Sequence, residues 1–250
     1  MADTGNLGIG VYLDNVKLEA SYAAESACTD GVDNDGNGKT DCADFACAGK
    51  TECLPTIVAD DMTCGSTNWL FAQSDGGTTW AIDQSPAAPV AKTGLCTLNY
   101  NNGSNYAVGG VISPKANGGT ATWNGKIDLA GKKAVYVKFW ENQSVEANLP
   151  CQNVQACNDR TYLQVSTDNF AGCGCAANQS CSFTSNNCQT DGTTTFVINK
   201  DAPNTWQFWL LDVSDFAGKQ VNLRWKFDTA DQNQNNFAGP FIDDFAVIGQ

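Results

Sequence analysis

The run Val221-Asn222-Leu223-Arg224-Trp225-Lys226-Phe227 alternates between apolar and polar side chains. A period of two residues is typical of a β-strand with one face in a core and the other in solvent. The run Val135-Tyr136-Val137-Lys138-Phe139-Trp140 repeats the pattern. We therefore expect the apolar members of the first run, Trp225 included, to face a core, and Val135, Val137 and Phe139 to share one face.

Further strand-like segments lie around these two runs. They are residues 162–165, 195–198, 206–211 and 241–248, and the last two are apolar on both faces. No segment shows sustained helical periodicity with caps at both ends. Many strands joined by Gly- and Asn-rich turns predict an all-β fold, an antiparallel β-sandwich of the jelly-roll kind.

Composition divides the chain into three parts. Residues 1–20 hold one isolated strand-like run, and residues 21–55 hold four cysteines with dense Asp and Gly. Residues 56–250 carry all seven tryptophans and are expected to form the jelly-roll domain, interrupted by a cysteine-rich insertion at 151–188.

Twelve cysteines and no histidine predict a disulfide framework in an oxidising compartment, outside the cell or at its surface. We expect six disulfides, with local pairing inside 28–53, between Cys64 and Cys96, and inside 151–188, where we favour Cys151 with Cys157. The three connectivities within 28–53 stay open. Residues 1–5 do not form a secretion signal, so the signal is expected upstream of an excised mature fragment.

The net charge of −13 excludes partners that need a basic protein face. Nucleic acid is therefore a poor partner. No apolar run reaches the length of a membrane span, so membrane insertion is not expected. An acidic, Asp-rich extracellular chain is suited to holding divalent cations.

The most specific motif is the twelve-residue stretch from Asp33 to Asp44. Its spacing matches a calcium loop, with Gly38 at the sixth position, where a sharp turn needs a permissive φ. Two carboxylates about 5 Å apart repel by roughly 0.8 kcal/mol even in bulk water, and a hard divalent cation reverses that repulsion. The alternative is an empty Asx-rich turn. The predicted Ca²⁺ ligands are Asp33, Asp35, Asn37, the Lys39 carbonyl, Asp41 and Asp44.

The cysteine-bracketed stretch from about residue 27 to 53 resembles the Asp-rich loops of thrombospondin type 3 repeats and dockerins. It departs from an EF-hand because no helix flanks it and Asp44 replaces the usual Glu. The resemblance implies a rigid, calcium-set spacer in a surface protein.

Residues 56–250 resemble the MAM-like jelly rolls of secreted bacterial proteins, as in immune inhibitor A-type proteins. The resemblance rests on ordered pieces, of which the closing ones are clearest: 211–219, 223–229 and 241–245. The insertion at 151–188 departs from the pattern. The resemblance implies a non-catalytic module for adhesion, glycan binding or assembly.

Catalysis is not expected. Without histidine, Ser-His and Cys-His nucleophiles and His-ligated metal hydrolases are excluded. Glu141 and Glu146 are the best carboxylate pair for a glycosidase, but residues five apart on a strand point to opposite faces. Glycan binding through stacked aromatics is the alternative function. Trp80, Trp123 and Trp140 are the tryptophans that are least clearly assigned to the core.

A second cation site is predicted in the jelly roll. Asp243 and Asp244 interrupt an apolar strand, and Asp60 and Asp61 end another. First and last strands of a jelly roll are often neighbours, so Asp61, Asp243 and Asp244 could share a cation. Hydrogen bonding from backbone N–H groups is the equal alternative.

The first strand has an internal match. Residues 6–18 align without gaps with residues 235–247, with Asn6, Gly10 and Asp14 identical to their partners. A lone strand cannot satisfy its own backbone groups. It is an upstream remnant, an edge strand of this chain, or a strand donated to a neighbour. We favour donation, which predicts a filament or surface-layer subunit whose partners are copies of itself or other surface proteins.

Overall fold

The computed structural model describes residues 25–47, 49–73, 78–86, 88–101, 103–108, 116–146, 159–171, 192–198, 204–229 and 235–250. The chain divides into two compact units, Met1–Cys53 and Leu54–Gln250. The proposed donor strand and the six cysteines of the 151–188 insertion, Cys151 and Cys157 among them, lie outside the described residues.

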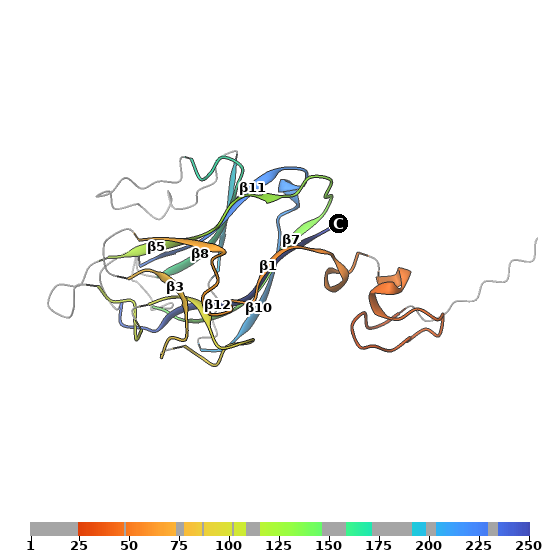
Figure 1. The fold of residues 1–250 in the computed structure, drawn as a ribbon, viewed down its shortest axis with the longest axis horizontal. Helices are drawn as coiled ribbons and strands as arrows, with labels where there is room; N and C mark the ends of the chain where they lie inside the picture. Colours follow the sequence, from red (N-terminus) through yellow and green to blue (C-terminus); the bar gives the residue numbers. More distant parts are fainter. Residues whose placement is uncertain are drawn as a thin grey trace, which may run out of the picture. The chain divides into compact units, whose positions relative to one another are not determined.

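The larger unit is an antiparallel β-sandwich of two six-stranded sheets, as the sequence predicts (Figure 1). The first sheet has the order β10-β7-β12-β4-β3, with β1 also paired to β12, and the second has the order β2-β5-β11-β8-β9, with β6 also paired to β11. The strands of the first sheet are β1 (Thr56–Asp60), β3 (Trp80–Asp83), β4 (Thr97–Tyr100), β7 (Val135–Ser144), β10 (Gln207–Asp212) and β12 (Gly239–Gly249). Those of the second are β2 (Trp69–Gln73), β5 (Gly118–Trp123), β6 (Ile127–Asp128), β8 (Arg160–Ser166), β9 (Thr193–Val197) and β11 (Gln220–Asp228).

Helical structure among the described residues is limited to short 3₁₀ turns. They are η1 (Asp41–Ala43), η2 (Phe45–Cys47), η3 (Thr51–Cys53) and η4 (Ser214–Phe216). In the part of the chain that the structure describes, no helix has the length and apolar character needed to cross a membrane.

The core lies between the two sheets and follows the period-two pattern. Val221, Leu223, Trp225 and Phe227 of β11 are all buried, and the polar residues between them are not. The Trp225 ring contacts the Phe139 ring of β7 edge to face, with centroids 4.7 Å apart. The inward and outward faces of both quoted runs are therefore confirmed.

Strand β12 is central to the first sheet, which explains why it is apolar on both faces. It pairs with β7 on one side and with β1 and β4 on the other. Asp60 of β1 lies opposite Phe245 of β12, so the first and last strands of the sandwich are neighbours, as expected.

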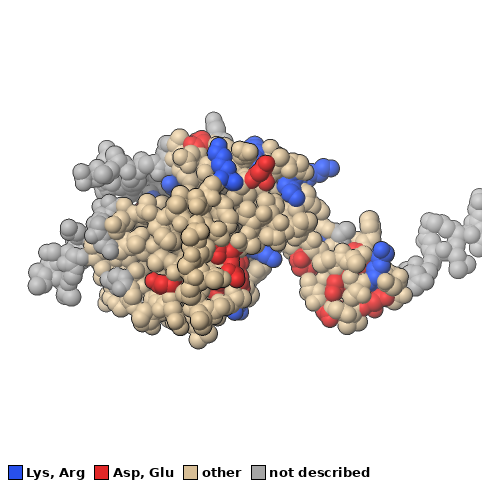
Figure 2. All heavy atoms as spheres, in the orientation of Figure 1, with Lys and Arg blue, Asp and Glu red and all other residues tan. Residues whose placement is uncertain are grey.

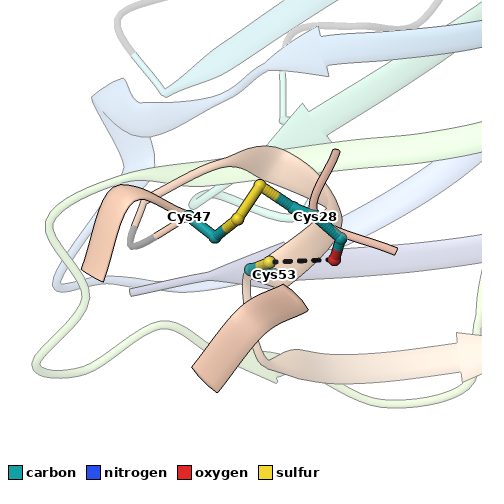
Figure 3. Close-up of side chains that lie close together, drawn as sticks. All are labelled: Cys28, Cys47 and Cys53. Atoms are coloured by element: carbon teal, nitrogen blue, oxygen red, sulfur yellow. Dashed lines mark hydrogen bonds between the residues drawn. A yellow bond between two sulfur atoms is a disulfide. The ribbon is translucent and has the colours of Figure 1, made fainter. Parts of the chain in front are cut away.

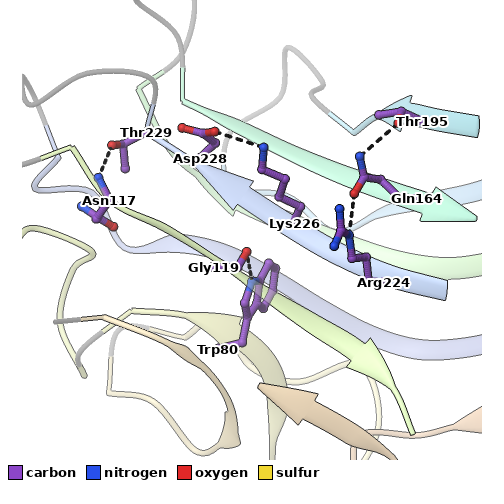
Figure 4. A network of polar contacts seen from close by, with 9 residues as sticks. All are labelled: Trp80, Asn117, Gly119, Gln164, Thr195, Arg224, Lys226, Asp228 and Thr229. Atoms are coloured by element: carbon purple, nitrogen blue, oxygen red, sulfur yellow. Dashed lines mark hydrogen bonds and ion pairs between the residues drawn. The ribbon is translucent and has the colours of Figure 1, made fainter. Parts of the chain in front are cut away.

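The outer face of the second sheet carries a polar network (Figure 4). Arg224 Nε donates to Gln164 Oε1 at 2.6 Å, and Gln164 Nε2 donates to Thr195 Oγ1 at 3.1 Å. The Arg224 guanidinium also lies 3.9 Å from the centroid of the Phe170 ring. Burial lowers the pKa of Arg224. These contacts order the outward side chains of β8, β9 and β11.

Candidate calcium centre and candidate binding face

The smaller unit is held by two interleaved disulfides. Cys28 pairs with Cys47 and Cys42 with Cys53, which selects one of the three connectivities left open by the sequence. Cys64 pairs with Cys96 in the larger unit, as predicted. All six cysteines among the described residues are therefore oxidised. Very little apolar surface is buried in residues 25–53, so covalent closure supplies the order that a core would otherwise give.

The three sulfurs of Cys28, Cys47 and Cys53 lie within 4.8 Å of one another. Figure 3 shows the Cys28–Cys47 disulfide beside Cys53, whose sulfur lies 3.9 Å from the Cys28 carbonyl oxygen. Metal binding by cysteine needs thiolates, and disulfide sulfurs are not thiolates. This sulfur group is therefore part of the disulfide framework and is no metal site.

Asp33 organises the first half of the predicted calcium loop. Its Oδ1 accepts the N–H groups of Gly36 at 2.8 Å and Asn37 at 3.1 Å, and its Oδ2 accepts that of Gly38 at 2.8 Å. The bond from Gly38 is the largest of the causes that hold the pKa of Asp33 below its ordinary value. Gly38 has a φ of 85°, as the sixth position of the loop requires.

The predicted ligands Asn37 and Asp44 are tied to each other. Asn37 Nδ2 donates to Asp44 Oδ2 and, at 3.0 Å, to Asp35 Oδ2. The Asn37 side-chain oxygen accepts the N–H of Lys39 at 2.9 Å, and Asp44 Oδ1 accepts that of Ala46 at 2.6 Å. Asp44 is buried. In this arrangement the side chains of Asn37 and Asp44 stabilise the loop through hydrogen bonds within the protein.

The carboxylates of the loop converge on a residue that precedes it. Ligand atoms of Glu25, Asp33 and Asp35 lie within 4.8 Å of one another, and so do those of Glu25, Asp30 and Asp41. Three of the predicted ligands, Asp33, Asp35 and Asp41, are thus placed in carboxylate groups. Figure 2 shows the acidic side chains, in red, at the surface of the smaller unit.

Sequence analysis missed Glu25 and Asp30. Both lie before the twelve-residue loop, where its spacing rule does not reach. Gly31 N–H donates to both oxygens of Asp41, at 3.2 and 3.1 Å, which folds residues 30–31 against the loop's ninth position. Asp41 has a φ of 53°, a left-handed conformation that non-glycine residues seldom adopt. The spacing of residues in the sequence does not show that residues 30–31 fold back onto the loop.

The carboxylates of the second predicted site are bound by donors from the protein. Asp243 is fully buried and accepts the N–H groups of Lys92 at 2.7 Å and Thr93 at 3.2 Å. Its neighbour Asp244 accepts the Thr93 hydroxyl at 2.6 Å. Burial raises the pKa of Asp243, and these N–H bonds oppose the rise. Both carboxylates therefore accept hydrogen bonds from residues 92–93, and a cation shared with Asp61 stays a prediction.

Asp61 belongs to a separate turn. It accepts the Thr63 hydroxyl at 2.6 Å and the Thr63 N–H at 3.1 Å, and the hydroxyl bond is the main cause of its lowered pKa. Among the described residues, no group of three close carboxylates contains Asp61, Asp243 or Asp244. Asp60 is the residue that points inward, and Trp69 Nε1 donates to it at 3.0 Å.

A candidate binding face lies on the outward side of β7 and β10. Trp140 and Phe208 are directly opposed in the strand register, and their ring centroids are 5.4 Å apart. Phe208 is 46% exposed, and the Lys92 ammonium lies 4.0 Å from the Trp140 ring centroid. Of the three tryptophans considered for glycan stacking, Trp80 is fully buried and Trp123 packs against the core. Only Trp140 of the three contributes to this face.

The carboxylate pair considered for catalysis is buried. Glu141 and Glu146 are 2% and 3% exposed, and Trp209 Nε1 donates to Glu141 at 2.9 Å. Strand β7 ends at Ser144, so Glu146 follows the strand and does not belong to it. Glycosidase carboxylates must flank a glycosidic bond. These two side chains are closed to such a substrate.

No protein-family model matches the chain, and no curated protein matches it. Solved structures with a similar fold include the carbohydrate-binding module TmCBM61 in complex with β-1,4-galactotriose, at 10% identity over 74% of this chain and 90% of that one, with a TM-score of 0.43. The C-terminal family 22 carbohydrate-binding module of Clostridium thermocellum Xyn10B has 11% identity over 78% and 94%, with a TM-score of 0.39. The K3 cleaved adhesin domain of Lys-gingipain from Porphyromonas gingivalis has 12% identity over 77% and 98%, with a TM-score of 0.44. These likenesses concern the β-sandwich fold alone.

Proposed function

We propose that this chain is a non-catalytic extracellular module whose β-sandwich binds a neutral glycan through the face around Phe208. The observation that carries the proposal is the exposed Phe208 ring supported by Trp140 on the neighbouring strand. Aromatic rings offer a rigid apolar surface on which the C–H face of a sugar packs. A net charge of −13 disfavours acidic polysaccharides. Lys92 supplies a hydrogen-bond donor beside the rings.

Affinity electrophoresis of the full chain through gels containing neutral or acidic polysaccharides tests this proposal. We expect retardation by at least one neutral polysaccharide and a dissociation constant at least tenfold weaker for Phe208→Ala. Leu70→Ala is the matched control, because Leu70 is 56% exposed on the other sheet. Equal retardation of Phe208→Ala and the parent, or no retardation in any gel, would contradict it.

We also propose calcium binding by the smaller unit. The supporting observation is the convergence of two carboxylate groups on one buried glutamate. Hard oxygen ligands in such numbers suit Ca²⁺. Hydrogen exchange of the full chain, with calcium and with a chelator, is the test. We expect calcium to slow amide exchange in residues 25–47 and to leave β11 unchanged, and equal exchange in both conditions would contradict calcium binding.

Self-assembly is a second candidate function, favoured by one feature of β10. Among the described residues, β10 is the terminal strand in the order of the first sheet, next to β7, and its outward residues Phe208 and Leu210 are 46% and 37% exposed. A terminal strand with exposed apolar side chains can accept a strand from another copy. The resemblance to MAM-like adhesion modules is compatible with this role.

Deleting residues 1–20 separates assembly from glycan binding. Strand donation predicts that sedimentation velocity detects oligomers of the full chain in calcium and only monomers of the truncated chain. Retardation by polysaccharide should be equal for both. A full chain that stays monomeric at high concentration, or a truncated chain that still polymerises, excludes strand donation.

A further inference from the structure

Glu25 has one carboxylate oxygen without a hydrogen-bond partner in a buried position. The side chain is 6% exposed, and no donor of the described residues lies within hydrogen-bond distance of its Oε1. Removing a carboxylate oxygen from water is unfavourable unless a donor or a cation replaces the water. Among the described residues, no lysine or arginine forms an ion pair with Glu25 or with the carboxylates grouped around it. A cation bound beside Oε1 would supply such a partner.

The other oxygen of Glu25 is held in place. Asn34 N–H donates to Glu25 Oε2 at 3.0 Å. The Asn34 side-chain oxygen in turn accepts the Ser26 hydroxyl at 3.1 Å and the Ala27 N–H at 3.0 Å. These hydrogen bonds hold residues 25–27 against Asn34, the residue that follows Asp33. One oxygen is fixed by the protein, and the other is left for a ligand.

Glu25 is the member common to both carboxylate groups. Asp33 and Asp35 lie with it in one group, and Asp30 and Asp41 lie with it in the other. Calcium–oxygen distances of about 2.3–2.6 Å allow two ligands of one ion to be at most about 5 Å apart. Each group meets that limit with its 4.8 Å spacing, and the five residues together do not form one such group.

We propose that Glu25 is a calcium ligand shared by two cations, one held with Asp33 and Asp35 and the other with Asp30 and Asp41. The proposal rests on calcium binding by this unit as proposed above. The five carboxylates carry five negative charges. One Ca²⁺ leaves an excess of three charges around a buried oxygen, and two leave an excess of one. Like charges this close repel, so the second cation is favourable.

Calorimetric titration of the full, chelator-treated chain with calcium chloride tests the proposal. We expect two ions per parent chain. Asp33→Asn and Asp41→Asn should each retain one ion, because each removes a carboxylate from one group only. Glu25→Gln keeps the shape and removes the shared charge, so both ions should bind at least tenfold more weakly. Glu52→Gln is the matched control, because Glu52 is an exposed residue of the same unit that lies outside both groups.

The outcomes separate the two proposals. A parent chain that takes up no calcium overturns calcium binding itself, and with it the role of Glu25. A parent that binds calcium while Glu25→Gln binds equally tightly overturns the role of Glu25 alone, and a parent stoichiometry of one overturns the shared centre.

Peptide mapping of both disulfides of the unit must show native pairing in every variant. Glu25→Asp keeps the charge on a side chain shorter by one methylene group. It should bind more weakly than the parent and more tightly than Glu25→Gln. Equal binding by Glu25→Asp and the parent would contradict coordination by this side chain.

Discussion

At the scale of single residues, neighbouring aspartates have opposite roles. Asp60 is buried at the end of β1 and accepts hydrogen bonds from Met62 N–H, the Ser66 hydroxyl, Asn68 Nδ2 and Trp69 Nε1. Asp61 is exposed, and its hydrogen bonds with the described residues are those to Thr63 in its own turn. A buried carboxylate with four donors fixes the turn that leads from the first sheet to the second.

Asp60→Ala is expected to destabilise the larger unit by about 2–4 kcal/mol, because it leaves buried donors, Trp69 Nε1 among them, without an acceptor. Asp61→Ala should change the unfolding free energy by less than about 1 kcal/mol. Urea unfolding monitored by tryptophan fluorescence measures both. Similar losses for the two variants would contradict the different roles.

Residue patterns predicted part of the candidate centre. The spacing from Asp33 to Asp44 identified Asp33, Asp35 and Asp41, because a loop with a required glycine fixes which positions face inward. Glu25 and Asp30 join the same groups because residues 25–31 fold back onto the loop, in a unit that two disulfides close. Cysteine positions alone allowed three connectivities, so the sequence could not indicate which distant carboxylates would meet.

At the scale of elements, strand β12 depends on a glycine at its start. Gly239 has a φ of 98°, and a Cβ at this position would lie 2.4 Å from the Tyr100 carbonyl oxygen. Residue 239 therefore needs both a left-handed backbone and the absence of a side chain. Gly125 shares the positive φ, at 107°, but has open space around it.

Gly239→Ala and Gly125→Ala separate these two requirements. Gly125→Ala should be destabilising by about 1 kcal/mol, from the unfavourable φ alone. Gly239→Ala should lose about 2 kcal/mol more, because backbone atoms of β4 must shift. Thermal and urea unfolding of both variants provide the comparison. Equal losses would show that the close approach to Tyr100 is relieved without strain.

The Cys64–Cys96 bridge closes a loop with a sequence separation of 32 residues. The double substitution Cys64→Ala and Cys96→Ala should lower the unfolding free energy of the larger unit by about 3–4 kcal/mol, from the entropy of the open loop. Substituting Cys42 and Cys53 should leave that transition unchanged, because both belong to the other unit. Urea unfolding curves decide between these expectations.

Strands that alternate cleanly were predictable, and short polar strands were not. The outward and inward residues of β7 and β11 followed directly from a period of two. Strand β5, Gly118–Trp123, begins with two glycines, and Ala121 and Trp123 are the apolar side chains that alternate with its two threonines, so its sequence gives a weak strand signal. It is a strand because β2 and β11 flank it and bond its backbone on both sides. The local sequence pattern does not predict such pairing between distant segments.

At the scale of the whole molecule, buried tyrosines make stability sensitive to alkali. Burial raises the pKa of Tyr162 to about 12. Burial, and then the charge of Asp159, also raise the pKa of Tyr106, whose hydroxyl donates to Asp159. Since both pKa values lie above the unfolded value of about 10, the stabilisation is complete below pH 10. It is lost as the pH rises towards the folded pKa.

Tyr162→Phe should reduce that loss. Between pH 10 and pH 12 the parent is expected to lose about 1.4 kcal/mol per pH unit more than the variant, because one proton fewer is released on unfolding of the variant. Comparison of the two chains at each pH cancels the titration of the remaining groups. Parallel stability curves in urea above pH 10 would contradict the assignment.

The interleaved pairing of Cys28 with Cys47 and Cys42 with Cys53 has a consequence for proteolysis. Trypsin cuts after lysine, and residues 25–53 offer Lys39 and Lys50. The piece that ends at Lys39 stays joined to residues 40–50 through Cys47, and that piece stays joined to the rest through Cys42 and Cys53. A molecule cut at both sites would release no fragment and would migrate as one chain until a reducing agent was added. The carboxylates of Glu25 and Asp41 would remain on linked peptides after the backbone between them was cut.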